Sequence, residues 1–156
     1  MRIEHINMTV VKIEDTIKFL KMLYPTLEII NSWEGKTEKG NERWAHVREK
    51  GSDSYFALEQ ADFMDKTRLK MNTFHGVNHF GLIVEGMKSI IKSFNEKGIK
   101  YSVAEAIDER VRVYCFDQHG FEYELIEYKT DDVETRFKYY NDVDGKAGVK
   151  QFLQNV

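Results

Sequence analysis

The sequence has one cysteine, one proline, no long apolar run and no strong excess of charge of either sign. The single thiol, Cys115, excludes a disulfide framework within the chain and fits a reducing compartment, so we expect a cytoplasmic protein. No apolar run approaches the ~20 residues that a membrane-spanning helix needs, and we expect neither a signal peptide nor membrane attachment. Twenty-three basic residues against 26 acidic ones give a net charge of −3, which argues against a general nucleic-acid binder.

What is present is the composition of a globular protein. The 156 residues are 42% hydrophobic, 31% charged and 13% aromatic, which excludes a disordered tail or a fibrous protein. This length is typical of a single domain, so we expect one domain over residues 1–156. With Pro25 as its one proline, the chain contains no stiff, proline-rich linker.

Hydrophobic periodicity predicts a strand, a helix and three strands in the first half. Polar and apolar residues alternate over 3–10, as in a half-buried strand. Apolar residues then recur at helical spacing from Asp15, a candidate N-cap, to Pro25. Turn residues separate three further strands, which we predict over 26–31, 42–48 and 55–60.

The same order recurs in the second half. The pattern predicts a strand over 77–84, a helix over 87–96 that ends at Gly98, and strands over 101–104, 110–116 and 122–128. Placing His79 on His5 also aligns apolar positions of the two halves, which indicates an internal duplication. We therefore predict an α+β fold of two modules, residues 2–60 and 77–128, joined by the connector 61–76. A helical tail, 129–156, follows and is capped by Asp131 or Asp132.

Strand alternation assigns the polar side chains to one face of each module. On the first strand Ile6, Met8 and Val10 pack on a helix, so His5 points the other way. The same test places Glu59, His79 and Glu124 on the face away from the helices. Two histidines and two glutamates thus share a polar face, and each pair is expected at a similar place in its half.

Four segments resemble the vicinal oxygen chelate superfamily, which includes glyoxalase I, extradiol dioxygenases, fosfomycin-resistance enzymes and bleomycin-binding proteins. They are IEHINMTV, FLKML, NHFGLIV and FDQHGFEYELIEY, and the resemblance covers about residues 2–128. It implies two βαβββ modules that form a curved mixed sheet around a cavity. It also implies a divalent metal ion (zinc, nickel, cobalt, manganese or iron) with the ligands His5, Glu59, His79 and Glu124.

The chemistry of these side chains agrees with that ligand set. Two imidazoles and two carboxylates suit a borderline divalent ion, and a six-coordinate ion would keep two positions for neighbouring oxygens of a substrate. The ion would act as a Lewis acid, and the resemblance to glyoxalase I suggests Glu124 as the base that takes a proton alpha to a carbonyl.

A basic strand adds a candidate substrate site. If the apolar residues of 110–116 pack on a helix, then Arg110, Arg112 and Tyr114 face the cavity, and guanidinium groups there would favour an anionic substrate. The alternative is that the arginines pair with local glutamates such as Glu109 or Glu122.

The remaining reactive residues have plainer interpretations. We expect Cys115 to be a buried, inert thiol, and we expect Glu127 to be a solvent-facing charge. His75 and His119 are expected in loops without a role, and the strand face of His46 is ambiguous.

At several positions the sequence departs from the pattern of the family, and two of these departures argue against one class of substrate. The turn FDQHG has Gln118 and His119 where the family commonly has Pro and Asp. Thr9 and Asn31 stand where glutathione-using enzymes of the family often carry arginine, which argues against glutathione.

These observations favour a metal-dependent lyase or isomerase that acts on a small oxygenated, anionic substrate. The alternative is a metal-independent protein that binds a small molecule in a cavity lined by aromatic residues (Trp33, Trp44, Tyr55, Tyr114 and Phe116). An iron-dependent dioxygenase ranks last, because a fourth protein ligand leaves too few positions for oxygen and a chelating substrate. We expect a homodimer, with the metal site either within one chain or shared.

Overall fold

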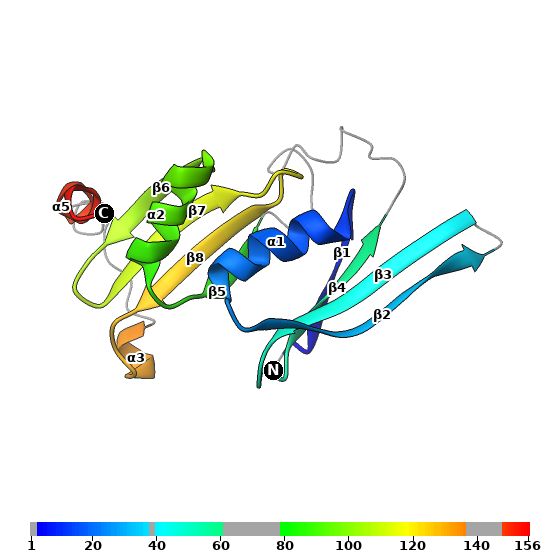
Figure 1. Ribbon diagram of the computed structural model, residues 1–156. Helices are drawn as coiled ribbons and strands as arrows, with labels where there is room; N and C mark the ends of the chain where they lie inside the picture. The colour runs from blue at the N-terminus through cyan, green and yellow to red at the C-terminus, as the bar shows by residue number, and fades with distance from the viewer. Residues whose placement is uncertain (1–2, 38–39, 61–78, 137–147) are drawn as a thin grey trace. The chain divides into compact units, whose positions relative to one another are not determined.

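The structure is a computed structural model that describes residues 3–37, 40–60, 79–136 and 148–156. The chain forms two compact units, Met1–Leu69 and Lys70–Val156, here called unit 1 and unit 2. Each unit contains one four-stranded sheet (Figure 1).

The sheet of unit 1 has the strand order β1-β4-β3-β2. Strands β1 and β4 run parallel, and the other neighbours are antiparallel. The elements of unit 1 follow the predicted order: β1 (His5–Val10), α1 (Ile13–Leu23), β2 (Leu27–Thr37), β3 (Gly40–Glu49) and β4 (Tyr55–Gln60).

Unit 2 repeats this topology with the strand order β5-β8-β7-β6. Strands β5 and β8 are parallel and the other two pairs are antiparallel, which confirms the predicted duplication. Its elements are β5 (Phe80–Ile83), α2 (Met87–Lys97), β6 (Tyr101–Ala106), β7 (Arg110–Phe116), β8 (Glu122–Tyr128), α3 (Val133–Arg136) and α5 (Val149–Gln154).

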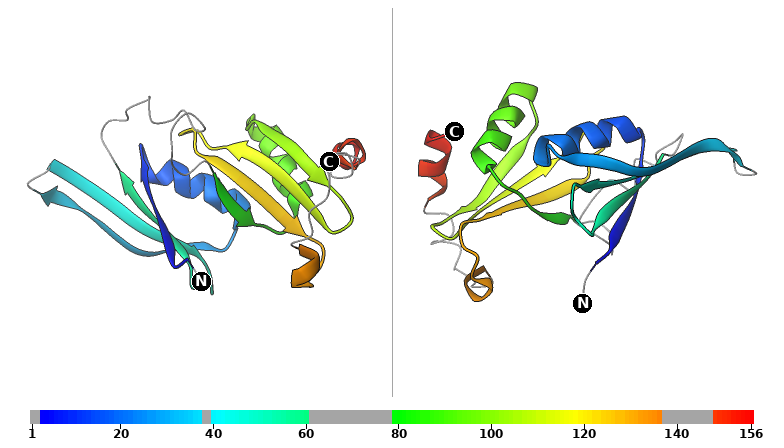
Figure 2. Two further views of the ribbon diagram at one scale, coloured as in Figure 1. Left: turned by 180° about the vertical axis from the view of Figure 1, so that it is seen from behind. Right: turned by 60° about the horizontal axis from the view of Figure 1, so that its bottom comes forward.

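Each sheet has one apolar face, and burial of that face sets the orientation of the other. In unit 1 the apolar face contributes fully buried side chains such as Val10, Val47 and Leu58, and α1 contributes Leu20. In unit 2 the helix α2 lies over one face of its sheet, and the view from behind shows the opposite face of that sheet (Figure 2). That second face of each sheet is where strand alternation places the polar candidates.

The helix ends show one error in the prediction. Helix α2 does end at its C-cap Gly98, which has a φ of 66° and adopts the left-handed conformation typical of a C-cap glycine. Helix α1 begins at Ile13, whose amide donates to Oε1 of Gln60 at 3.2 Å, so Asp15 is not the N-cap. Asp15 lies in the first turn, where its charge is favourable near the positive end of the helix dipole.

Bulges explain why the edge strands are longer than predicted. The pairing of β2 with β3 shifts register between Ile29 and Asn31, and the pairing of β6 with β7 shifts between Val103 and Glu105. The extra residue of a bulge interrupts the alternation of polar and apolar side chains. The sequence pattern therefore predicts that the strand ends at the bulge. Both strands continue beyond the bulge.

The described part of the tail is helical in two short segments. Asp132 caps α3, because its Oδ2 accepts the amide of Thr135 at 3.1 Å. Helix α5 packs on β6, and Gly148 approaches so closely that a Cβ there would lie 2.1 Å from the carbonyl oxygen of Ala106. Residues 137–147 of the predicted helical tail lie outside the described residues. None of the described helices is long and apolar enough to cross a membrane.

Candidate functional site

The second predicted pair of site residues forms a direct contact in unit 2. Nε2 of His79 lies 3.1 Å from Oε2 of Glu124, with the histidine directly before β5 and the glutamate on the parallel strand β8. The Glu124 side chain is only 9% exposed, whereas the imidazole is 36% exposed. The pair therefore has a buried carboxylate and an accessible ring.

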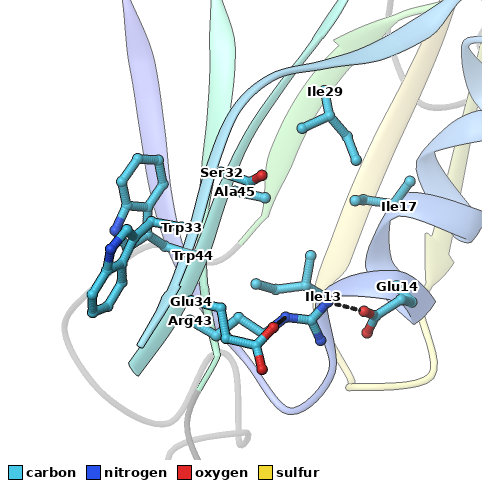
Figure 3. A pocket seen from close by; sticks show the side chains of 10 residues that line it. All are labelled: Ile13, Glu14, Ile17, Ile29, Ser32, Trp33, Glu34, Arg43, Trp44 and Ala45. Carbon is cyan, nitrogen blue, oxygen red and sulfur yellow. Dashed lines mark hydrogen bonds and ion pairs between the residues drawn. The ribbon is translucent and has the colours of Figure 1, made fainter. Parts of the chain in front are cut away.

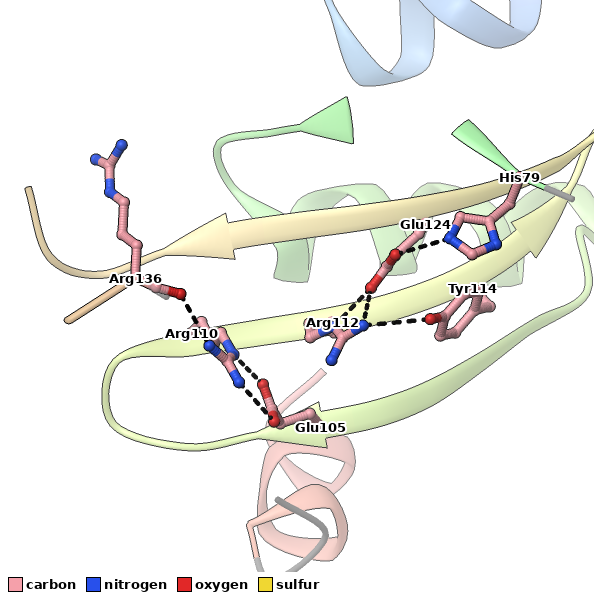
Figure 4. A network of polar contacts seen from close by, with 7 residues as sticks. All are labelled: His79, Glu105, Arg110, Arg112, Tyr114, Glu124 and Arg136. Atoms are coloured by element: carbon pink, nitrogen blue, oxygen red, sulfur yellow. Dashed lines mark hydrogen bonds and ion pairs between the residues drawn. The ribbon is translucent and has the colours of Figure 1, made fainter. Parts of the chain in front are cut away.

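Arg112 on the adjacent strand β7 holds the other oxygen of the same carboxylate. Its Nε donates to Oε1 of Glu124 at 2.6 Å, and its Nη2 pairs with the same oxygen (Figure 4). Nη2 also donates to the hydroxyl oxygen of Tyr114 at 3.3 Å. Burial, and then the charge of Glu124, raise the pKa of Tyr114, so its phenol stays protonated at neutral pH.

The spacing within the His79–Glu124 pair fits two ligands of one ion. Donor atoms that each lie about 2.1 Å from a metal at a right angle are about 3.0 Å apart. The observed separation of Nε2 and Oε2 is 3.1 Å. Within the described part of either unit taken by itself, no three His, Cys, Asp or Glu side chains group as a metal site. The pair by itself therefore supplies two donor atoms at a suitable spacing, which is fewer than a complete metal site needs.

His5, the predicted ligand of unit 1, is oriented by two neighbours. Its Nδ1 lies 2.9 Å from Oε2 of Glu4, and its ring stacks on that of Tyr55 with a centroid distance of 4.8 Å and an interplanar angle of 18°. The side chain is 42% exposed. With Nδ1 engaged by a carboxylate, Nε2 is the nitrogen left for a ligand bond.

Glu59 does not occupy the position that matches Glu124. In unit 1 Glu59 pairs with Thr9, four residues after His5, whereas Glu124 pairs with Gly81, two residues after His79. The residue of unit 1 that matches Glu124 in register is the buried Ala57, which pairs with Asn7. Glu59 thus lies two residues along β4 from the position that matches Glu124, and the expectation of two similarly placed His–Glu pairs is wrong. Asn7 Nδ2 donates to Oε1 of Glu59 at 3.0 Å.

Arg110 was predicted to face the cavity and to bind an anionic substrate. In the structure its side chain is buried and paired with another residue of unit 2. Two of its nitrogens pair with the carboxylate of Glu105, one of them at 3.1 Å, and both side chains are 8% exposed. Its Nη1 also donates to the backbone oxygen of Arg136 at 3.0 Å (Figure 4). The alternative of a local ion pair describes this residue, although the partner is neither Glu109 nor Glu122.

A row of aromatic rings crosses the polar face of unit 1. Beyond the stack of His5 on Tyr55, the ring of His46 lies 4.9 Å from that of Tyr55 and 4.9 Å from that of Trp44. These contacts settle the ambiguous face of His46, which is the face of His5. Trp33 pairs with Trp44 across the β2–β3 hairpin and lies over Gly35, where a Cβ would be 2.4 Å from the indole.

Three other residues differ from or confirm their predictions. His119 lies in the β7–β8 turn, as expected of a loop residue, but it is buried, and its amide donates to Oδ1 of Asp117. Glu127 is also not a free surface charge, because its Oε1 accepts the amides of Gly86 and Met87 at the start of α2. Cys115 is buried as expected, and burial raises its pKa to about 12. The predicted loop residue His75 lies outside the described residues.

Unit 1 also contains a cavity of about 240 Å³ between the start of α1 and the β2–β3 hairpin. Figure 3 shows Arg43 reaching toward Glu14 and Glu34 on the helix side, with the two tryptophans on the other side of the hairpin. The hydrogen bond from Arg43 lowers the pKa of Glu14. Trp33 and Trp44 line this cavity, but none of the four predicted metal ligands does.

Sequence reasoning missed the partners of the predicted residues. Glu4, Asn7 and Glu105 each bind a residue that the sequence had singled out. Adjacency to His5 was a signal for Glu4, and a shared strand face was a signal for Asn7. The bulge in β6 concealed Glu105, because the alternation that assigns faces is interrupted there.

No protein-family model and no curated relative matches the sequence. Solved structures do match, among them a glyoxalase family protein from Bacillus cereus. That match has a TM-score of 0.69 and 14% identity and covers 82% of this chain and 94% of the other.

Two further structures are matched over most of their length. A mutant of the fosfomycin resistance protein FosX from Listeria monocytogenes, in complex with Mn(II) and 1S,2S-dihydroxypropylphosphonic acid, has a TM-score of 0.60 and 17% identity, with 88% and 98% coverage. TnmS3, an antibiotic-binding protein from Streptomyces, has a TM-score of 0.54 and 15% identity, with 83% and 97% coverage. The chain thus has the fold of the vicinal oxygen chelate superfamily, which confirms the resemblance at the level of the fold.

Proposed function

We propose that this protein is a metal-dependent lyase or isomerase of the glyoxalase-like type that acts on a small oxygenated, anionic substrate. The observation that carries the proposal is the His79–Glu124 pair, whose 3.1 Å spacing fits two neighbouring ligands of one ion. Support also comes from FosX, a protein of the same fold whose structure contains Mn(II).

The proposed protein ligands are His5, His79 and Glu124, with Glu59 as a fourth candidate. A bound divalent ion would supply Lewis-acid stabilisation of negative charge on substrate oxygens. The ligand set combines nitrogen and oxygen donors and therefore leaves the identity of the metal open among zinc, nickel, cobalt, manganese and iron.

Of the two carboxylates, Glu59 is the more accessible to a substrate, because its side chain is exposed whereas that of Glu124 is only 9% exposed. Both oxygens of Glu124 are also engaged, since Arg112 donates to Oε1 and Nε2 of His79 lies beside Oε2. Among the described residues, the one hydrogen-bond partner of Glu59 is the neutral amide of Asn7. The proposal therefore moves the base from Glu124, the sequence-based candidate, to Glu59, which would take a proton from the substrate carbon.

Arg112 and Tyr114 are the proposed contacts of an anionic group on the substrate. Nη1 of Arg112 has no hydrogen-bond partner among the described residues, and the neutral phenol of Tyr114 can donate a proton in a hydrogen bond. FosX was crystallised with a phosphonate. Small phosphonates and carboxylates that carry a neighbouring hydroxyl, epoxide or carbonyl are accordingly the substrate classes to test. Arg110 takes no part, because its guanidinium is held by Glu105.

Metal analysis of untagged protein tests the proposal directly. We expect about one divalent ion per ligand set in wild type and loss of that ion in His79→Ala and Glu124→Gln. A protein that binds no divalent metal under any loading condition, with turnover unchanged in both variants, would refute the assignment.

The proposed assembly is a homodimer in a reducing cytoplasm. Two-fold dimers are the commonest soluble oligomers. The described part of either unit by itself contains no group of three His, Cys, Asp or Glu side chains that could hold a metal ion, so the proposed site would need both half-sets, His5 with Glu59 from unit 1 and His79 with Glu124 from unit 2. Mixing inactive His5→Ala and His79→Ala chains distinguishes a shared site from a site within one chain. Activity returns in part only when the two half-sets come from different chains.

A second candidate function is metal-independent binding of an aromatic compound. The row of rings from His5 to Trp44 supports it, since the centroids of neighbouring rings are no more than 4.9 Å apart. TnmS3, which shares the fold, is an antibiotic-binding protein. Ligand binding that persists in excess chelator and is lost in Trp44→Ala, without turnover, would favour this function over the enzyme.

A further inference from the structure

Glu4 stands directly before the candidate ligand His5 and contacts its ring. Oε2 of Glu4 lies 2.9 Å from Nδ1 of His5, a normal hydrogen-bond distance. The backbone at this point is anchored to β4, because Tyr55 donates its amide to the carbonyl oxygen of Glu4 at 3.0 Å. Ser54 donates its hydroxyl to the carbonyl of Ile3 at 3.0 Å. The carboxylate is thus exposed, but its main chain is fixed.

A carboxylate at Nδ1 selects one form of a neutral imidazole. An ionised carboxylate only accepts hydrogen bonds, so Nδ1 must carry the proton and Nε2 must carry the lone pair. The stacked ring of Tyr55 restrains the plane of the imidazole in addition. In unit 2 the nitrogen beside a carboxylate is instead Nε2 of His79, so by the same rule a neutral His79 carries its proton on Nε2 in the metal-free protein. A metal ion bound at that nitrogen would require the other tautomer of His79, whereas Nε2 of His5 already carries the lone pair.

We infer that Glu4 is a positioning residue, which holds His5 in the Nδ1–H tautomer and leaves Nε2 to bind a divalent metal ion. The part that concerns metal rests on the proposed function. Carboxylates in this second layer typically change metal affinity about 10–100-fold. Glu4 touches neither substrate nor metal in this role and acts only through the imidazole.

The first test uses the metal-free protein and does not depend on metal binding. Two-dimensional ¹H–¹⁵N spectra of the imidazole, recorded at a pH where the ring is neutral, report which nitrogen carries the proton. Wild type is expected to show the Nδ1–H form, and Glu4→Ala the Nε2–H form. Glu4→Gln should retain the Nδ1–H form, because the amide oxygen still accepts a hydrogen bond.

The second test titrates Co²⁺ into the same proteins by calorimetry. Glu4→Ala is expected to raise Kd about 10–100-fold, and Glu4→Gln to raise it less. Glu34→Ala is the matched control, because Glu34 is a comparably exposed carboxylate of unit 1 (75% against 67%) that pairs with Arg43. This control removes the same charge and should leave both tautomer and Kd unchanged.

The outcomes separate the inference from the proposed function. An unchanged tautomer in Glu4→Ala overturns the inference even if wild type binds Co²⁺ tightly. A changed tautomer with an unchanged Kd, or an equal loss of affinity in Glu34→Ala, also overturns it. If wild type binds no Co²⁺ while Glu4→Ala still changes the tautomer, the metal-dependent function fails and the positioning of His5 by Glu4 stands.

Discussion

The two units share one topology but present different chemistry on their polar faces. In unit 2 the carboxylate of Glu124 is 9% exposed and is held by the guanidinium of Arg112 and by His79. In unit 1 the carboxylate of Glu59 is exposed and is held by the amide of Asn7. Unit 2 thus carries a buried charge network where unit 1 carries an accessible carboxylate.

The sheet registers show how the two faces differ position by position. With Ala57 matched to Glu124, Trp44 matches Arg112 and His46 matches Tyr114. Unit 1 therefore carries an indole at the position where unit 2 carries a guanidinium. One duplicated scaffold supports a row of rings in one copy and an ion-pair network in the other, because strand positions fix where a side chain emerges but not its chemistry.

The largest expected effect comes from breaking the buried ion pair of unit 2. Arg110→Ala leaves the carboxylate of Glu105 buried without its cation, which typically costs about 3–5 kcal/mol of unfolding free energy. The control in unit 1 is Arg48→Ala, which removes the part-exposed pair with Glu28 and should cost at most ~1 kcal/mol. Urea unfolding measures both variants. Equal losses would show that burial does not distinguish the two units.

The next effect concerns metal and separates the two carboxylates. Glu124→Gln should raise the Kd for Co²⁺ about 100-fold, since the roughly 10–16 kcal/mol with which a four-ligand structural zinc site binds its ion is about 3 kcal/mol for each ligand. Glu59→Gln should change Kd little and reduce kcat, because the proposal assigns it proton transfer. Calorimetry and steady-state kinetics on the same preparations provide the comparison. A Glu59→Gln variant that loses metal as completely as Glu124→Gln would restore the four-ligand set and contradict the assignment of Glu59 as base.

A smaller effect is expected from filling the space under the indole of Trp33. In Gly35→Ala the new methyl would lie 2.4 Å from the ring, so the ring must move away from β2. We expect a loss of about 1 kcal/mol in unfolding free energy and a changed tryptophan emission spectrum. Gly51→Ala is a useful contrast, because nothing lies within 4 Å of its added Cβ but its φ of 86° is strained for alanine. That variant should lose stability without altering the emission of the folded protein.

The smallest effects are pH dependences of opposite sign in the two units. Burial raises the pKa of Asp117 in unit 2, so the native state holds this proton more tightly than the unfolded state, and stability falls as pH rises through the window above the ordinary value of 3.8. In unit 1 the hydrogen bond from Arg43 lowers the pKa of Glu14, so its contribution is present above the ordinary value of 4.5 and is lost as pH falls below it. Unfolding curves of Asp117→Asn and Glu14→Gln between pH 3 and 7 should remove slopes of opposite sign. Slopes of the same sign would contradict the account.

Much of the fold was predictable because each element is encoded locally. Alternation and helical spacing predicted the order of strands and helices in both halves, and the duplication predicted the shared topology. The end of α2 was predictable because Gly98 is a local signal. The start of α1 was not, because its first amide is satisfied by Gln60, which lies 47 residues away in the sequence.

The site was less predictable because it depends on register and on distant partners. Alternation placed His5, Glu59, His79 and Glu124 on polar faces, but it carries no information on the pairing of β1 with β4. Because of that pairing, Glu59 lies two residues along β4 from Ala57, the residue that occupies the position of Glu124 in unit 1. The burial of Arg110 likewise depends on Glu105 beyond a bulge and on a backbone oxygen of the tail.

The uneven distribution of two residue types gives each unit its own reporter. Both tryptophans of the chain, Trp33 and Trp44, lie on the β2–β3 hairpin of unit 1, whereas the one cysteine, Cys115, is fully buried in unit 2. Tryptophan fluorescence therefore follows unit 1, and labelling of the thiol by an aromatic disulfide follows the opening of unit 2. A single unmodified chain can thus show whether its two copies of the scaffold unfold together or in sequence.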